Sequence, residues 1–141
     1  MTVEKMIALR AAPIFSTVEP EGLAELARAS REDEFPAGTE LCAEGQPGAE
    51  VFVLLAGEVE VLMKDGPGEK LVSKERAGGF IGELAVLDPA PRSARLRAGN
   101  IGARVLRLDG DAFRDAVEAE PSIASQVIRT LAQRLRRNSA K

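Results

Sequence analysis

GGFIGELAVLDPAPRSAR, residues 78–95, is the stretch of the chain that indicates most about the fold and its use. Glycines precede the run from Glu83 to Leu87, which has the composition of a short helical turn. The first amides of such a turn lack partners within the helix and favour an anion in front of them. The segment therefore predicts an anion-binding turn inside a larger fold.

Donors suited to a phosphate surround this turn in the sequence. Gly82 has no side chain to keep a ligand away from its backbone. Arg92 follows a loop stiffened by Pro89 and Pro91, and Ser93 adds a hydroxyl beside it. One arginine with a few amides and a hydroxyl suits a singly charged phosphate. A triphosphate would call for a Walker-type lysine motif, and the sequence has none.

Glu83 is the unexpected member of the set, because a carboxylate beside a phosphate repels it. A sugar hydroxyl such as a ribose 2′-OH would satisfy this carboxylate by donating a hydrogen bond. Taken alone, Glu83 is more often a helix-start carboxylate and Arg92 a surface cation. Their ordered combination favours a ligand, and hydrogen bonds to charged groups of about 1.5–3 kcal/mol each are enough for micromolar binding.

The residues before and after this segment have the pattern of short β-strands. Pro and Gly clusters separate brief apolar runs from Asp33 onward. The stretches 58–63 and 93–98 alternate apolar and polar side chains, and 51–55 is apolar throughout, as in a strand buried on both faces. Many short strands at this spacing predict an antiparallel jelly-roll barrel.

Helical patterns lie at both ends of the chain. A helix is expected to begin near Pro20, and two more are expected after Asp111, separated by Pro121. In the last one, Ile123, Val127, Leu131 and Leu135 follow each other at intervals of four residues. This stripe packs either on the chain's own barrel or on a second copy, and the sequence leaves both open.

Together these patterns predict a mainly β fold with flanking helices, an antiparallel jelly-roll barrel forming a single domain over residues 1–141. Its parts are a helical region at 1–32, a barrel at 33–110 that includes 78–95, and lid or dimer helices at 111–138.

Composition excludes several classes of function. The chain has no histidine and a single cysteine, Cys42. This removes the common nucleophile pairs, the usual transition-metal ligands and any internal disulfide, so we expect no enzyme, metal or cofactor. The net charge is −3, and the apolar N-terminal stretch is interrupted by Arg10 and Pro13. We therefore expect a cytoplasmic protein with no direct nucleic-acid or membrane partner.

Residues 78–94 closely resemble the phosphate-binding cassette of cyclic nucleotide-binding domains, as found in bacterial catabolite regulators, cyclic-nucleotide-dependent kinases and gated channels. The runs 35–39, 44–48 and 51–61 also resemble the glycine-marked barrel strands of that family. With the two C-terminal helices, the resemblance covers nearly the whole chain.

The resemblance implies a role for individual residues. Glu83 matches the glutamate that binds the ribose 2′-OH, and Arg92 matches the arginine that pairs with the cyclic phosphate. The full ligand-binding set expected is Gly82, Glu83, Leu84, Ala85, Arg92, Ser93 and Ala94.

The base has fewer expected contacts. The chain has no tryptophan or tyrosine, so the base is expected against aliphatic residues such as Val61, Leu62 or Leu84. By analogy with catabolite regulators, Asn138 and Ser139 of the last helix are expected to supply polar contacts.

We therefore expect a sensor of cAMP, with cGMP as the alternative ligand, whose C-terminal helices close over the base around Pro121. Arg92→Ala is expected to weaken binding severely and leave the fold intact. One alternative is an interaction module with an empty pocket that dimerises through its last helix. Another is a piece of a larger cyclic-nucleotide-regulated transcription factor, channel or kinase. A jelly-roll metalloenzyme is disfavoured by the lack of histidine.

Overall fold

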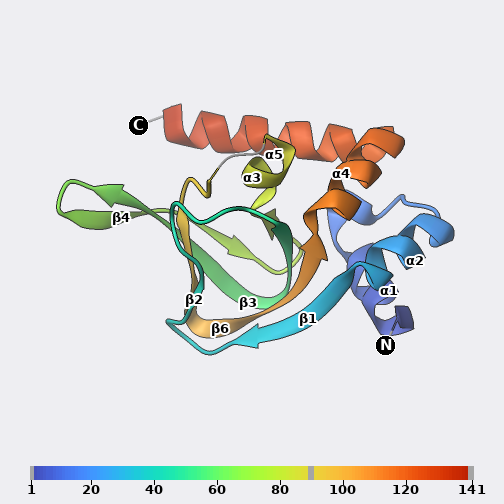
Figure 1. The fold of residues 1–141 in the computed structure, drawn as a ribbon, viewed down its shortest axis with the longest axis horizontal. Helices are drawn as coiled ribbons and strands as arrows, with labels where there is room; N and C mark the ends of the chain where they lie inside the picture. The colour runs from blue at the N-terminus through green and yellow to red at the C-terminus, as the bar shows by residue number, and fades with distance from the viewer. Residues whose placement is uncertain (1, 89–90, 140–141) are drawn as a thin grey trace.

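The computed structural model describes residues 2–88 and 91–139, and its helices gather at one end and along one side of a β-barrel (Figure 1). The N-terminal elements are α1 (Thr2–Ala11), η1 (Pro13–Phe15) and α2 (Pro20–Arg28). α2 begins at the expected proline, with Glu19 as its N-cap residue. The first strand starts at Ser30, so the N-terminal helical region ends slightly earlier than the predicted boundary at residue 32.

All strand pairings are antiparallel, in the order β1-β6-β3-β4, with β2 added on β6 and β5 on β3. The strands are β1 (Ser30–Phe35), β2 (Glu40–Cys42), β3 (Glu50–Asp65), β4 (Gly68–Arg76), β5 (Phe80–Ile81) and β6 (Arg95–Asp109). Within the described residues β1 and β4 do not pair, so the sheet stays open and the fold is jelly-roll-like. The predicted fold class is confirmed.

Two strands are much longer than the sequence pattern predicted. β3 has 16 residues and β6 has 15. Gly57, which lies between the predicted strands 51–55 and 58–63, is inside β3 with φ +81°, where the register with β6 shifts. A Cβ at this position would lie 2.9 Å from the Cα of Ala103 in β6. The glycine therefore bends one continuous strand through a β-bulge instead of terminating it.

β3 separates two apolar clusters because its successive side chains point to opposite faces. Val51 and Val53 pack in a cluster beneath the helices, whereas Phe52 and Leu54 pack inside the barrel. All four side chains are buried, which confirms the strand predicted to be covered on both faces. The helical cluster also contains Leu9, Phe15, Phe113 and Ile123, and the barrel cluster contains Val59, Leu96 and Val105.

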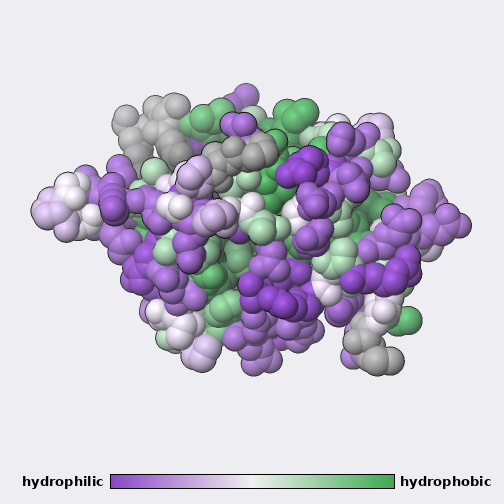
Figure 2. Space-filling view, in the orientation of Figure 1, coloured by the Kyte–Doolittle hydropathy of each residue, from purple (hydrophilic) through white to green (hydrophobic). Residues whose placement is uncertain are grey.

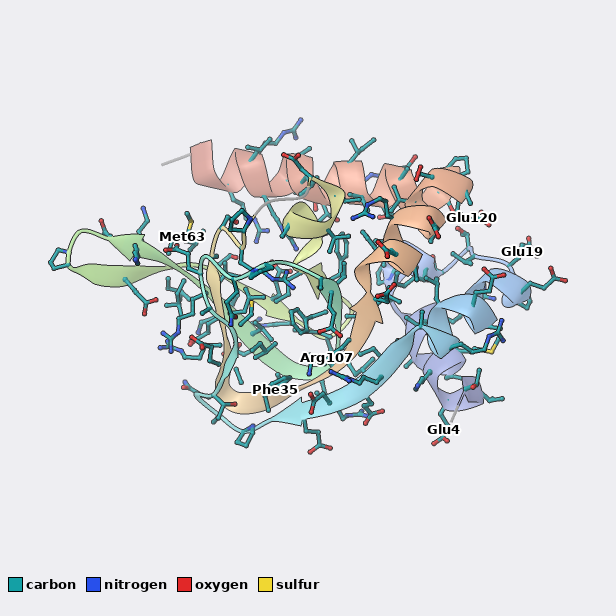
Figure 3. All side chains as sticks on the ribbon, in the orientation of Figure 1. Glu4, Glu19, Phe35, Met63, Arg107 and Glu120 are labelled. Atoms are coloured by element: carbon teal, nitrogen blue, oxygen red, sulfur yellow. The ribbon has the colours of Figure 1, made fainter. Side chains whose placement is uncertain are left out.

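Ion pairs of Arg107 tie strands β6, β1 and β3 together at the surface. Arg107 of β6, labelled in Figure 3, has one Nη atom 3.0 Å from Asp33 of β1 and the other 2.8 Å from Glu50 of β3. All three side chains are partly exposed. This network fixes the start of β3, which precedes the site described below.

The C-terminal helices are α4 (Gly110–Ala119) and α5 (Pro121–Ser139). The apolar stripe predicted on the last helix does not stay on one face. Ile123 and Val127 are buried against the helical cluster, but Leu135 is 67% exposed. A four-residue repeat gains about 40° per step around an α-helix, so the stripe rotates from the core toward solvent.

Candidate functional site

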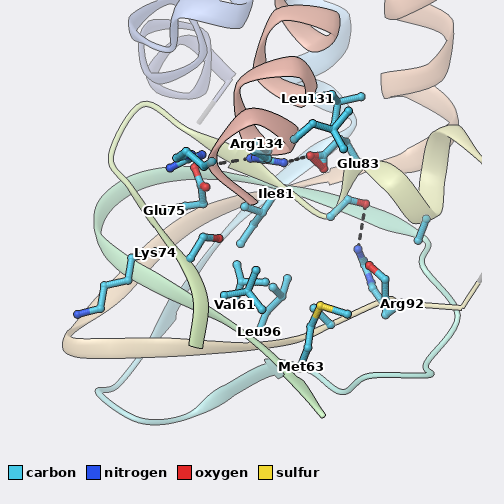
Figure 4. Close-up of a pocket in the computed structure, with 18 residues that line it drawn as sticks. Val61, Met63, Lys74, Glu75, Ile81, Glu83, Arg92, Leu96, Leu131 and Arg134 are labelled. Carbon is cyan, nitrogen blue, oxygen red and sulfur yellow. Dashed lines mark hydrogen bonds and ion pairs between the residues drawn. The ribbon is translucent and has the colours of Figure 1, made fainter. Parts of the chain in front are cut away.

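A cavity of about 690 Å³ lies between the inner face of the sheet, the short helix α3 (Glu83–Leu87) and α5 (Figure 4). α3 is the helical turn that the sequence predicted. Most of the wall is apolar, and charged side chains gather near α3. From the sheet the lining residues are Val61, Met63, Val72, Ser73, Lys74, Glu75, Ile81 and Leu96. From the segment 78–95 and α5 they are Gly82, Glu83, Ala85, Arg92, Ser93, Ala94, Leu131, Arg134, Leu135 and Arg137.

Most of the residues predicted to bind ligand meet at this one cavity. The glycine, the carboxylate and the arginine of the predicted set all line it, together with Ala85, Ser93, Ala94 and the expected base contact Val61. Leu62 is only 5% exposed and is not among the lining residues, because its neighbours Val61 and Met63 line the cavity and successive side chains of a strand point to opposite faces. The side chains of Leu84, Asn138 and Ser139 lie outside the described part of the structure.

Arg92 is a buried cation held in place by backbone carbonyls. It is 7% exposed, and its Nη1 and Nη2 atoms donate to the carbonyl oxygens of Gly82 at 3.0 Å and Glu50 at 2.7 Å. Its guanidinium carbon lies 5.4 Å from the ring centroid of Phe52. No described carboxylate forms an ion pair with it, and its Nε atom is buried without a hydrogen-bond partner among the described residues. A buried charge in this condition favours an anionic ligand.

Gly82 is required by this arginine. Its φ is +89°, a conformation that favours glycine, and an added Cβ would lie 2.5 Å from Arg92 Nη1 and 3.2 Å from the carbonyl oxygen of Glu50. From the sequence, this glycine was expected to let a ligand approach its backbone. In the structure, the guanidinium of Arg92 occupies that space.

Glu83 is the most deeply buried carboxylate of the cavity, at 1% exposure. Its Oε1 atom accepts a hydrogen bond from Nη1 of Arg134, a residue of α5. Arg134 also donates to the carbonyl oxygen of Phe80 at 2.6 Å and lies 3.6 Å from Glu75 (Figure 4). The carboxylate is therefore connected to the C-terminal helix.

Arg134 is a site residue that the sequence did not indicate. It is 51 residues away from Glu83 in the chain. No local pattern links positions so far apart, so only the packing of α5 over the cavity brings them together.

Arg114 of α4 holds the other end of α3. Its Nη2 and Nε atoms donate to the carbonyl oxygen of Val86 at 2.7 and 3.3 Å. A helix end leaves such carbonyls without partners, and an arginine satisfies them. The short helix is thus attached to α4 at its end and to α5 through Glu83 at its start.

The loop before β3 completes the surroundings of Arg92. The amide of Arg92 donates to the carbonyl oxygen of Gln46 at 2.7 Å, and the amide of Gly45 donates to that of Arg92 at 2.9 Å. Cys42 lies close enough for the charge of Arg92 to act on its thiol. Burial raises the pKa of Cys42, and the positive charge of Arg92 partly opposes that increase.

The described residues offer no alternative centre for metal chemistry. Among them, no group of three or more Cys, Asp or Glu side chains is arranged to hold a metal ion. None of the helices in this part of the chain combines the length and apolarity needed to cross a membrane. The chemistry available at the cavity is recognition of an anion and a hydroxyl beside an apolar wall.

Comparison with known proteins agrees with this geometry. The chain is 33% identical over 132 residues to a CRP-like cAMP-activated global transcriptional regulator of Mycobacterium tuberculosis, covering 93% of this chain and 58% of that protein. It is 38% identical over 106 residues to a cAMP-dependent protein kinase regulatory subunit of Aspergillus fumigatus, covering 75% of this chain and 25% of the subunit. The chain thus spans only part of the length of these relatives.

A solved structure shares the fold. The regulatory subunit of a cAMP-independent protein kinase A from Trypanosoma brucei matches with a TM-score of 0.79 and 24% sequence identity, covering 92% of this chain and 48% of that one. The sequence profile described as cyclic nucleotide-binding domain matches residues 32–120, more than half of the chain. The chain therefore belongs to the cyclic nucleotide-binding domain family.

Proposed function

We propose that the cavity binds cAMP, with Arg92 contacting the cyclic phosphate and Glu83 accepting a hydrogen bond from the ribose 2′-OH. The observation that carries this proposal is Arg92, a buried guanidinium without an acidic partner among the described residues. A phosphate in front of it would supply the missing counter-charge and an acceptor for Nε. A ligand that supplies both the negative charge and the acceptor for Nε should therefore bind more tightly than a ligand that supplies only one of them.

The charge of the cavity matches a phosphodiester better than a phosphate monoester. Near α3 the lining contains the cation Arg92 and the carboxylate Glu83. A cyclic phosphodiester brings one negative charge, whereas a monoester such as 5′-AMP brings close to two at neutral pH. Of the other lining cations, Lys74 pairs with Glu58 and Arg134 with Glu83 and Glu75, so the single negative charge of a phosphodiester matches the one guanidinium that is buried without an acidic partner among the described residues.

The apolar part of the cavity suits a purine lying against aliphatic side chains. Val61, Leu96 and Leu131 line this part, and Met63 lies at its edge. Two relatives are named for activation by or dependence on cAMP, whereas the trypanosomal kinase subunit is named as cAMP-independent. Ser93 beside the phosphate site is compatible with either base, so cGMP is the alternative ligand.

We further propose that α5 acts as a lid over the base. It reaches the cavity through Leu131, Arg134 and Leu135. A ligand that contacts these side chains binds the closed position more tightly than an open one and shifts the helix toward it. Pro121, between α4 and α5, is the natural hinge because it cannot continue a helix from α4.

A second copy of the chain is the proposed partner of an apolar row on α5 that runs along the edge of the cavity, since Leu131 and Leu135 of this row also line the cavity. Ile128 and Leu135 are each 67% exposed on this helix. The intervals from one residue to the next are four, three and four along the row Ala124, Ile128, Leu131 and Leu135. This spacing is that of a two-stranded coiled coil. Figure 2 shows hydrophobic residues along the edge of the molecule over α5.

Isothermal titration tests the ligand directly. We expect micromolar binding of cAMP, weaker binding of cGMP and no heat with 5′-AMP. Absence of heat from both cyclic nucleotides at high micromolar concentration would exclude the proposed ligand. If that result came together with a dimer mass in light scattering, the alternative of a dimerising interaction module with an empty pocket would replace the sensor.

A further inference from the structure

The two oxygens of the Glu83 carboxylate are in different situations. Oε1 accepts the hydrogen bond from Arg134. No described residue donates to Oε2, and this atom is not among the buried polar atoms that are closed off without a partner. Since Glu83 lines the cavity, Oε2 is available there. One oxygen is held by the protein and the other is left to a ligand.

Arg134 is itself firmly anchored before any ligand arrives. It donates to the carbonyl oxygen of Phe80 at 2.6 Å, and its guanidinium carbon lies 5.5 Å from the ring centroid of that residue. Glu75, with a side chain only 14% exposed, lies 3.6 Å from it on the other side. An arginine with several fixed contacts presents its remaining donor in a defined direction. It can therefore orient the carboxylate instead of following it.

We propose that Arg134 is the positioning residue for ribose recognition: it orients Glu83 through Oε1 so that Oε2 faces the ligand's 2′-OH. This inference rests on the proposed function, because it assumes a cyclic ribonucleotide in the cavity. It assigns Arg134 a role different from that of Arg92, which serves the phosphate. The preference for ribose over deoxyribose should then depend on Arg134, and the affinity for the phosphate should not.

The position of Arg134 on α5 adds a consequence for regulation. The orientation of Glu83 exists only while α5 is docked over the cavity. Ribose recognition and helix docking therefore favour each other, and by thermodynamic linkage each must stabilise the other by the same factor. Deoxyribonucleotides, which lack the 2′-OH, would gain much less from docking.

The test compares cAMP with 2′-deoxy-cAMP on the wild type and on Arg134→Gln. We expect the wild type to prefer cAMP by about 10- to 100-fold, as for one hydrogen bond to a charged acceptor. Arg134→Gln should reduce this preference to about 3-fold or less and should change the affinity for 2′-deoxy-cAMP by less than about 3-fold. If Arg134 only stabilised the fold, its replacement would weaken the binding of both nucleotides to the same extent.

Two further variants complete the design. Arg129→Gln is the matched control, because Arg129 is exposed on the same helix and does not line the cavity. It should keep the full ribose preference. Arg134→Lys retains the cation with a shorter reach and should recover part of the preference. Thermal denaturation of each variant verifies folding. If Arg134→Gln does not fold, the ratio of the affinities of Arg134→Lys for cAMP and 2′-deoxy-cAMP decides. A ratio equal to that of the wild type would count against the proposal.

The outcomes separate the two proposals. If the wild type binds neither nucleotide, the proposed function fails and this inference fails with it. If it binds both equally, Glu83 does not recognise the 2′-OH, so the inference and the proposed ribose contact are overturned while cyclic nucleotide binding through Arg92 stands. A folded Arg134→Gln variant that keeps the wild-type preference also overturns the inference while leaving cyclic nucleotide binding in place.

Discussion

Nη1 of Arg92 donates a hydrogen bond of 3.0 Å to the carbonyl oxygen of Gly82, and the same atom occupies the space that a side chain at Gly82 would need. Nη2 of Arg92 meanwhile donates to the carbonyl oxygen of Glu50 at the start of β3. The arginine proposed to bind phosphate thus connects the turn before α3 to the central strand of the sheet. Binding and stability depend on the same side chain.

Arg92→Ala should remove nearly all affinity for cyclic nucleotides. Loss of one partner from a buried charged contact costs about 2–5 kcal/mol. The variant should also be less stable by about 1–3 kcal/mol, because two buried carbonyl oxygens lose their donor. The variant should still fold, as expected from the sequence, but with this lower stability. Titration and denaturant unfolding measure the two effects.

Arg95→Ala is the control for that experiment. Arg95 forms ion pairs with Glu40 and Glu69, all partly exposed, and it does not line the cavity. Its removal should change stability by less than about 1 kcal/mol and leave affinity unchanged. A folded Arg92→Ala protein with wild-type affinity would contradict the proposed phosphate contact.

Gly82→Ala should impair binding by displacing Arg92. The new Cβ would force the guanidinium away, and the left-handed backbone costs about 1–2 kcal/mol for a residue other than glycine. Gly38→Ala is matched for backbone strain, since Gly38 has φ +80° but no atom within 4 Å of an added Cβ. Titration should show a loss of affinity for Gly82→Ala only. Equal affinities in the two variants would argue against a fixed position of Arg92.

The Cys42 thiol should report on the phosphate site. Burial raises its pKa, so at pH 8.5 the folded protein should react with iodoacetamide more slowly than the unfolded chain. The positive charge of Arg92 lowers this pKa, and a bound phosphate would offset that charge. cAMP should therefore slow alkylation further. An alkylation rate that is the same with and without saturating cAMP would speak against a phosphate beside Arg92.

The raised pKa of the Cys42 thiol also predicts how the stability of the protein changes with pH. A folded-state pKa above the unfolded value means that the folded protein binds more protons in the interval between the two values. The contribution is fully present below the unfolded pKa and is lost as pH rises toward the folded one. The difference in the free energy of unfolding between the wild type and Cys42→Ser, measured with denaturant, should therefore be smaller at pH 9.5 than at pH 7. A difference that grows with pH would contradict the raised pKa.

Ile128→Asp should prevent self-association through α5. A charge in the seam of a two-stranded coiled coil is costly because it would be buried without a partner. Ile101→Asp provides the comparison, since Ile101 is 78% exposed on β6 and away from α5. Light scattering should give a dimer mass for the wild type and Ile101→Asp and a monomer mass for Ile128→Asp. A monomeric wild type at high micromolar concentration would rule out this interface.

Local patterns in the sequence were enough for the architecture and for the core of the site. Gly–Pro punctuation and alternation predicted an antiparallel jelly-roll fold, and the run Glu83–Leu87 forms the predicted helix. These signals work because turns, strand faces and helix starts depend on residues that are close in the chain. The predicted segment also brings Glu83 and Arg92 to one cavity.

Tertiary packing alone decided how those residues are held and what covers them. The contact of Arg134 with Glu83 joins positions 51 residues apart, and the bond from Arg92 to Glu50 spans 42. The stripe on α5 divides between core and solvent because a four-residue repeat turns around the helix, so that Ile123 and Val127 pack on the helical cluster and Leu135 does not. The sequence determined which chemical groups are present and their local geometry, whereas long-range contacts determined which of them face each other, since spacing along the chain carries no information about that.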